Sequence, residues 1–172
     1  MSLNPKIYLA GPDVFIKNSD IGERKKVACR KLGFDALYPL DNEISGQNAA
    51  LEIYKANCLM IDQADIVLAN ISPFRSPHCD VGTSFEIGYA VAHRKPVYTY
   101  SNDTRTLIER IKEDFPEMLD DGTNVEDFGL HENLMLGMGS SLPCFTRDER
   151  TDLSAWQAFN DAIQAVKEIQ GK

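Results

Sequence analysis

The sequence predicts an α/β fold, a three-layer sandwich in which a parallel sheet of four to five strands lies between helices. Short apolar runs, typical of buried parallel strands, alternate with longer segments in which apolar residues recur every three or four positions. The chain has 172 residues, which matches one domain over residues 1–172 with a sizeable core. Right-handed crossovers then place helices on both faces of the sheet.

The expected strands are short apolar segments bounded by turn residues. The segment 65–70 is almost wholly apolar and rich in β-branched residues, which favours a central strand covered on both faces. Pro39 interrupts the second segment, and the fifth is the weakest of the set. The segments are 6–10, 34–40, 65–70, 96–100 and 142–145.

Six helices are expected between and after these strands. The segment 84–93 carries apolar residues all round, which predicts a buried helix. Gly33 is typical of a residue just past a helix end, and Thr151 is the expected N-cap of the last helix. The segment 49–63 carries one apolar face. The segments are 21–32, 49–63, 84–93, 104–115, 131–136 and 151–169.

Charge and cysteine spacing exclude several classes of function. The net charge of −8 argues against nucleic acid or an anionic membrane as a partner, because both require basic surface. The four cysteines are scattered without paired spacing, so neither a zinc site nor a disulfide framework is indicated. No long apolar run or basic-then-apolar leader occurs. We therefore expect a cytoplasmic protein without metal or cofactor.

The stretch Asp80–Ala90 lies between two expected strands, at the carboxyl edge where open α/β sheets bind ligands. It holds two carboxylates, Asp80 and Glu86, and Gly82 would let a ligand approach the backbone. Two carboxylates repel a phosphate, so the pattern favours a neutral, hydroxyl-rich ligand and suggests glycosyl transfer. Alternatively, Glu86 completes a capping box with Thr83 as the N-cap.

The chain resembles the nucleoside 2-deoxyribosyltransferase family over most of its length. The most specific match is the pattern Asp-x-Gly-x-x-x-Glu-x-Gly-Tyr-Ala at 80–90, and a strand carrying Tyr8 before a Gly-Pro turn strengthens it. The matching segments are 6–12, 39–43, 64–67, 80–90 and 132–135.

The resemblance implies a flavodoxin-like sheet of five strands and a double displacement. Glu86 would attack C1′ of a 2′-deoxynucleoside, release the base and carry the deoxyribose until a second base takes it. Asp80 would protonate the leaving base, and the Tyr8 hydroxyl would hold Glu86 in line. From the residues alone, Tyr8 could equally be a core tyrosine whose hydroxyl binds a carbonyl.

The resemblance also implies substrate contacts. Gly11 and Gly82 would border the substrate, and Phe15 would stack on the base, although an aromatic side chain at a loop edge often only packs. Glu43 and Asn57 match base-facing positions where other members carry Gln and Asp, so base preference does not carry over. Asn133 would reach the sugar of a neighbouring subunit.

The expected substrates are therefore 2′-deoxynucleosides and free nucleobases, and the expected assembly is a homo-oligomer with shared sites. The apolar run Leu134–Leu136 favours burial against another subunit, although it could instead dock onto its own domain. Two other functions stay open: a deoxynucleoside monophosphate N-glycosidase, disfavoured by the acid Asp13 in the first loop, and a non-catalytic nucleoside-sensing module. His78 is expected to be a solvated loop residue.

Overall fold

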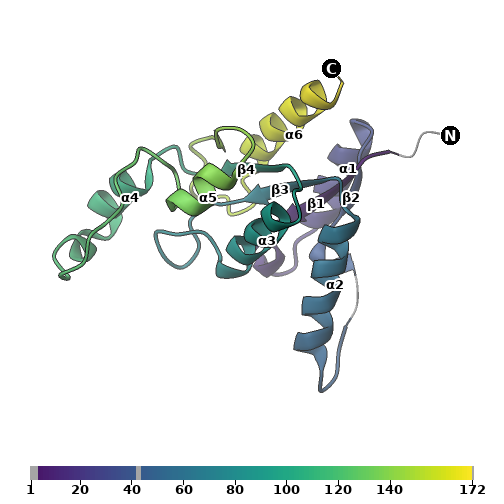
Figure 1. Ribbon diagram of the computed structural model, residues 1–172, viewed down its shortest axis with the longest axis horizontal. Helices are drawn as coiled ribbons and strands as arrows, with labels where there is room; N and C mark the ends of the chain where they lie inside the picture. The colour runs from purple at the N-terminus through teal and green to yellow at the C-terminus, as the bar shows by residue number, and fades with distance from the viewer. Residues whose placement is uncertain (1–3, 42–43, 172) are drawn as a thin grey trace.

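The computed structural model describes residues 4–41 and 44–171, and these form an α/β fold built on a five-stranded parallel sheet (Figure 1). The strand order is β2-β1-β3-β4-β5, which is the order of flavodoxin-like folds. The predicted fold class is confirmed. The strands are β1 (Lys6–Ala10), β2 (Asp35–Leu37), β3 (Ile66–Asn70), β4 (Val97–Ser101) and β5 (Phe145–Thr146).

Alternation along the strands divides the core between the two faces of the sheet. Ile7 and Leu9 of β1 pack with residues of α1 and α6, whereas Tyr8 and Ala10 pack with residues of α2 and α3. Tyr8 therefore points toward α3. The helices are α1 (Ile21–Lys31), α2 (Ala49–Gln63), α3 (Val81–Ala92), α4 (Leu107–Asp114), α5 (Leu134–Gly139) and α6 (Trp156–Gln170), and the 3-10 turns are η1 (Pro12–Phe15), η2 (Pro39–Asp41) and η3 (Pro116–Leu119).

The chain reverses its direction of winding between β1 and β3. From β1 it passes outward to β2, and after β2 it returns to pair β3 with the other edge of β1. The loops that leave β1 and β3 thus separate at the carboxyl edge and open a crevice, the usual ligand site of such sheets.

Four predicted helix starts were wrong. The helices expected from residues 104 and 131 begin three residues later, at Leu107 and Leu134. α3 begins at Val81 because Asp80, not Thr83, is its N-cap, and Asp80 Oδ2 accepts the Thr83 backbone N–H at 3.1 Å. α6 begins at Trp156 rather than near Thr151, and the Glu149 carboxylate accepts the first-turn N–H groups of Gln157 and Ala158. A side chain distant in sequence thus caps α6, which sequence spacing cannot reveal.

The prediction that α3 is buried all round was also wrong. Its inner face, with Thr83, Ile87 and Ala90, is buried against the sheet. On the other side Val81 is 85% exposed and Phe85 is 49% exposed. The helix is apolar on both faces, but the described chain covers only one of them.

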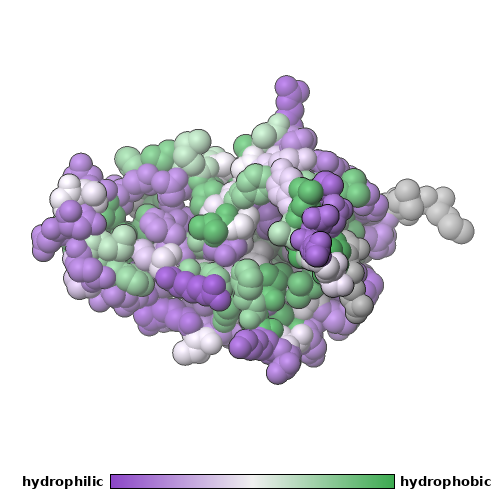
Figure 2. Space-filling model, turned by 90° about the horizontal axis from the view of Figure 1, so that it is seen from below, coloured by the Kyte–Doolittle hydropathy of each residue, from purple (hydrophilic) through white to green (hydrophobic). Residues whose placement is uncertain are grey.

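The N-terminal half of α2 projects beyond the sheet, away from the other helices (Figure 1). The predicted apolar face of this helix is buried only at its C-terminal end, at Ile61, whereas Leu51 and Tyr54 are each 51% exposed. Figure 2 shows the molecule from below, the direction in which α2 extends in Figure 1, and hydrophobic residues gather near the centre of this face. Within the described residues, no helix is long and apolar enough to span a membrane.

Candidate active site

A short hydrogen bond joins the sheet to α3 at the carboxyl edge. The Tyr8 hydroxyl donates to Glu86 Oε1 at 2.6 Å. Tyr8 is completely buried, so β1 fixes the position of its ring, and Glu86 lies in the second turn of α3. Glu86 therefore does not complete a capping box. A capping box does occur at Thr106 and Glu109, at the start of α4.

The surroundings of Glu86 disfavour its ionised form. Burial, with a contribution from the nearby charges of Asp80 and Asp13, raises the pKa of the Glu86 carboxyl to about 7, although the hydrogen bond from Tyr8 acts in the opposite direction. Burial and the Glu86 charge raise the pKa of Tyr8, which keeps its proton and stays a donor. The Tyr8 hydroxyl thus orients the Glu86 carboxyl group, which exists in both protonation states near neutral pH.

Asp80 begins α3 beside Glu86. Its Oδ2 caps the helix through Thr83 N, whereas Oδ1 makes no hydrogen bond to any described residue. A Cβ at Gly82 would lie 2.9 Å from Asp80 Oδ2, so a side chain at position 82 would crowd this carboxylate. One Asp80 oxygen builds the helix start, and the other is available to a ligand.

Both carboxylates line a cavity of about 710 Å³. Its walls come from the loop after β1, from η2 and the segment after it, from α2 and from the start of α3. This volume suits a small molecule the size of a nucleoside. The lining residues are Gly11, Val14, Phe15, Pro39, Leu40, Ile44, Ser45, Ile53, Asn57, Asp80, Gly82, Thr83 and Glu86.

An aromatic group and an amide group line this cavity from different elements. Phe15 is 51% exposed and stacks on Phe74 with ring centroids 5.3 Å apart, and the Arg75 guanidinium lies 4.6 Å from the Phe74 centroid. From α2, Asn57 lines the cavity with a buried Oδ1 that has no hydrogen-bond partner within the described part of the chain. Such an unpaired acceptor is costly unless a ligand donates to it. The prediction for Glu43 falls outside the described residues.

The profile of a family described as Nucleoside 2-deoxyribosyltransferase matches residues 7–135, well over half of the chain. The chain belongs to the nucleoside 2-deoxyribosyltransferase family. It is 36% identical to a 2-desoxiribosyltransferase from Leishmania mexicana, in an alignment that covers 91% of this chain and 97% of that one with a TM-score of 0.67.

Two more distant relatives extend the comparison. A 2-deoxyribosyltransferase from Bacillus psychrosaccharolyticus is 20% identical, with 87% of this chain and 90% of that chain covered and a TM-score of 0.52, a likeness of fold alone. An uncharacterized protein of Schizosaccharomyces pombe is 29% identical over 116 residues, which are 63% of this chain and 55% of that protein. The matched region thus spans about half the length of this curated relative.

Asn133 lies apart from the Glu86 cavity of its own chain in this family member. It is the N-cap of α5: its Oδ1 accepts Met135 N at 3.0 Å, and its Nδ2 donates to Glu126 Oε1 at 2.7 Å. It borders a separate cavity of about 220 Å³ that His78 and Glu126 also line. The structure therefore brings together Tyr8, Gly11, Phe15, Asn57, Asp80, Gly82 and Glu86, but not Asn133.

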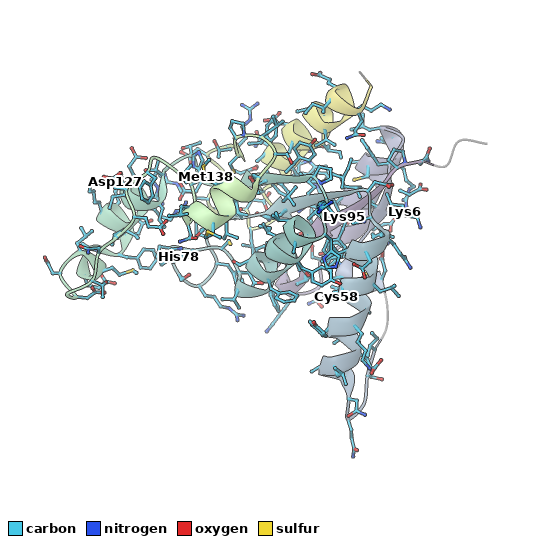
Figure 3. All side chains as sticks on the ribbon, in the orientation of Figure 1. Lys6, Cys58, His78, Lys95, Asp127 and Met138 are labelled. Atoms are coloured by element: carbon cyan, nitrogen blue, oxygen red, sulfur yellow. The ribbon has the colours of Figure 1, made fainter. Side chains whose placement is uncertain are left out.

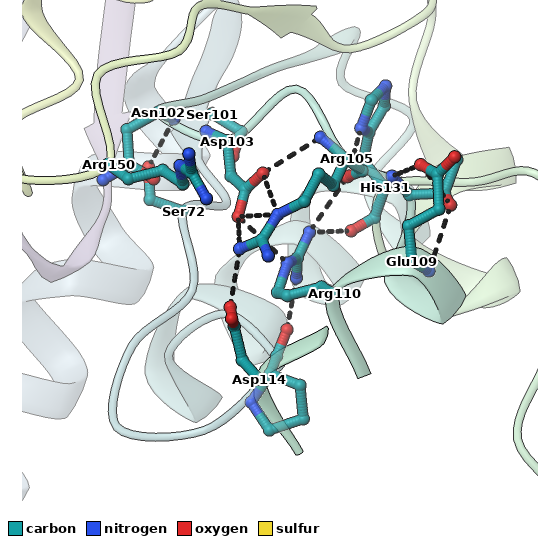
Figure 4. A network of polar contacts seen from close by, with 12 residues as sticks. Ser72, Ser101, Asn102, Asp103, Arg105, Glu109, Arg110, Asp114, His131 and Arg150 are labelled. Atoms are coloured by element: carbon teal, nitrogen blue, oxygen red, sulfur yellow. Dashed lines mark hydrogen bonds and ion pairs between the residues drawn. The ribbon is translucent and has the colours of Figure 1, made fainter. Parts of the chain in front are cut away.

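Sequence reasoning missed the groups that fix the segment before Asp80. Glu132, 2% exposed, accepts Cys79 N at 3.0 Å and bonds His78 Nδ1 at 2.6 Å. His78 is thus half-exposed but paired, and its pKa is raised by the bond to Glu132. Arg110, 1% exposed, donates to the carbonyls of Pro77 and His131 within an arginine–aspartate network (Figure 4). The only sequence signal for Glu132 was its place in the family segment 132–135.

Proposed function

We propose that this protein transfers 2-deoxyribose between nucleobases through a covalent deoxyribosyl–Glu86 intermediate, in nucleoside salvage. The observation that carries the proposal is the 2.6 Å bond from Tyr8 to Glu86, because it directs one carboxylate oxygen of a ligand cavity and leaves the other free. Membership in the family supports the same reaction.

In the first step Glu86 Oε2 attacks C1′ of a 2′-deoxynucleoside. The C1′–N bond breaks, its electron pair passes to the base nitrogen, and the Asp80 carboxyl donates a proton to the base. The Tyr8 hydroxyl keeps its bond to Oε1 throughout and stabilises the carboxylate as it forms and leaves the ester. In the second step a nitrogen of another base attacks C1′, the Glu86 carboxylate departs with the electron pair, and Asp80 accepts the proton of the incoming base.

The lining of the cavity favours nucleosides over nucleoside monophosphates. Its described residues include two carboxylates, Asp80 and Glu86, and no lysine or arginine. Asp13, considered in the N-glycosidase alternative, is buried and paired with Lys25. A 5′-phosphate entering the cavity would meet the two carboxylates with no lysine or arginine among the described lining residues, which disfavours the N-glycosidase.

Product analysis tests the proposal against both alternatives. Thymidine or deoxyinosine is incubated with adenine, and the products are separated by chromatography. Formation of deoxyadenosine is expected. Release of deoxyribose phosphate from a nucleoside monophosphate without base exchange would support the N-glycosidase, and the absence of any reaction would support the sensing module. Mass spectrometry of the intact protein, quenched with substrate but no acceptor, should detect a deoxyribosyl adduct that Glu86→Ala lacks.

We further propose that the active unit is a homo-oligomer. Leu136 docks onto the core of its own chain, but Met135 and Met138 are 74% and 73% exposed, and Figure 3 labels Met138 at α5. The exposed apolar residues of α3 and the projecting half of α2 add to this uncovered surface. Half a helix with little tertiary support is marginally stable in water, so contact with a second copy would stabilise it. Asn133 would then be available to a neighbouring site.

A further inference from the structure

A buried ion pair lies beneath the loop that follows β1. Lys25 of α1 is fully buried, and its ammonium donates to Asp13 Oδ2 at 2.8 Å and to the Tyr100 hydroxyl at 2.8 Å. Asp13, 3% exposed, also accepts Asn70 Nδ2 at 3.1 Å through its other oxygen. Residues of α1 and β3 thus bind one carboxylate of η1, and a residue of β4 accepts a hydrogen bond from its lysine partner.

Stability alone does not explain this pair. Removing an ammonium and a carboxylate from water costs free energy, and their mutual attraction offsets only part of this cost. Well-packed apolar residues at such positions often make a fold equally stable or more stable. Burial lowers the pKa of Lys25, while the Asp13 charge opposes that change. The arrangement has a specific geometric result, however: it fixes the orientation of the Asp13 carboxyl and of the turn that carries it.

That turn forms one wall of the Glu86 cavity. Gly11, Val14 and Phe15, which flank Asp13 in sequence, all line the cavity. The Asp13 carboxylate packs tightly under the backbone of this wall, since a Cβ at Gly11 would lie 2.5 Å from Asp13 Oδ1 and 2.7 Å from the Asn70 Cβ. The wall therefore rests on the ion pair through contacts that leave no room for even one methyl group.

We propose that Asp13 and Lys25 are positioning residues that fix residues 11–15 over Glu86 and thereby determine how the deoxyribosyl–Glu86 intermediate divides between an incoming base and water. The inference rests on the proposed function. An incoming base must be bound and oriented against Phe15 before its nitrogen can attack C1′, and small misplacements slow such attack strongly. Water needs little orientation, so a displaced wall would slow transfer far more than hydrolysis.

Both outcomes break the same ester bond between C1′ and Glu86. In hydrolysis the oxygen of water forms a bond to C1′, the ester bond to Glu86 breaks with its electron pair returning to the carboxylate, and the water proton passes to Asp80. Free deoxyribose leaves instead of a nucleoside. The measurable quantity is therefore the ratio of deoxyribose released to base exchanged, at a fixed concentration of acceptor.

The test compares the wild type with Asp13→Asn/Lys25→Met, which removes both charges and leaves an amide oxygen for Asn70. The ratio of hydrolysis to exchange should rise about tenfold, with a higher KM for the acceptor base. Tyr100→Phe removes one hydrogen bond to Lys25 and should raise the ratio by a smaller factor. Ile163→Val, in the buried face of α6, is the matched control, because it weakens the fold without removing a charge or a hydrogen bond beneath the loop and should keep the wild-type ratio.

A purely structural role would lower both rates by the same factor, because fewer molecules would be folded, and the ratio would not change. A folded double variant with the wild-type ratio overturns the inference. If the double variant does not fold, a wild-type ratio in Tyr100→Phe overturns it. A wild-type protein that neither exchanges bases nor releases deoxyribose refutes the proposed function itself, and this inference with it.

Discussion

Replacing Glu86 by Gln should abolish base exchange and, at the same time, stabilise the fold at alkaline pH. The amide keeps the shape of the side chain and an oxygen that can accept the bond from Tyr8, but it cannot ionise or act as the nucleophile. A pKa of about 7 in the folded protein, against an ordinary 4.5, means that the ionised carboxylate opposes folding. At about 1.4 kcal/mol for each tenfold change in the proton-binding constant, this opposition amounts to about 3 kcal/mol.

The sign of the pH dependence follows from which state loses its proton first. As the pH rises from 4.5 to 7, the unfolded chain releases the Glu86 proton while the folded protein still retains it, so the stability of the wild type declines through this window. The variant has no such decline. Its advantage should be near zero below pH 4.5 and reach up to about 3 kcal/mol above pH 7.

Urea unfolding at several pH values, together with chromatographic assays of exchange, measures both effects. Glu109→Gln is the matched control, because Gln can replace Glu in the capping box at the start of α4 and the site is distant from the cavity. Hydrogen bonds from Thr106 lower the Glu109 pKa, so this control should show no gain between pH 4.5 and 7. A stability difference for Glu86→Gln that does not vary with pH, or near wild-type exchange, would refute the reasoning.

Three further predictions concern the reaction. Ribonucleosides should react much more slowly than 2′-deoxynucleosides, because the 2′-hydroxyl destabilises the cationic transition state and needs space beside Glu86. Equal rates for adenosine and deoxyadenosine would contradict the proposed transfer of 2-deoxyribose. The kcat/KM of exchange should decline on acidification with a midpoint near pH 7. Tyr8→Phe should move this midpoint to higher pH, because it removes the hydrogen bond that lowers the Glu86 pKa. An unchanged midpoint would contradict this role of Tyr8. Glu86→Ala and Asn133→Ala proteins, each inactive or impaired, should regain activity after dissociation and joint reassociation, unless each chain completes its own site.

The sequence was sufficient for the fold and for the residues that the family motif carries. The alternation of buried strands with amphipathic helices predicted the parallel sheet, and the spacing of Asp80 and Glu86 led to the cavity. Local spacing misassigned the N-caps, because an aspartate three residues earlier captures Thr83 N and a distant glutamate caps α6. Apolar composition likewise suggested a buried α3, since hydropathy does not distinguish a side covered by the same chain from one available to another.

Other features could not be predicted because they depend on tertiary contacts. Nothing in the local sequence around Lys25 or Glu132 marks a charge that will be fully enclosed, and charged residues are ordinarily exposed. Their partners, Asp13 and the Cys79 backbone, lie 12 and 53 positions away in the chain. The strands expected over 34–40 and 142–145 also differ from the structure, where β2 is only Asp35–Leu37 and β5 is only Phe145–Thr146. Each pairs with only one neighbour at an edge of the sheet, where fewer cross-strand contacts stabilise a strand.

Tyr8 comes from a central strand of the sheet, and this gives the site two parts. One part tolerates few amino-acid substitutions, and the other tolerates many. The aiming bond to Glu86 depends on how α3 packs on β1, and both elements belong to the densely filled interior. Phe15 and Asn57, by contrast, lie on a loop and on the projecting helix. If the proposed function holds, substitutions at the rim would change which base is bound and leave the Tyr8–Glu86 pair intact.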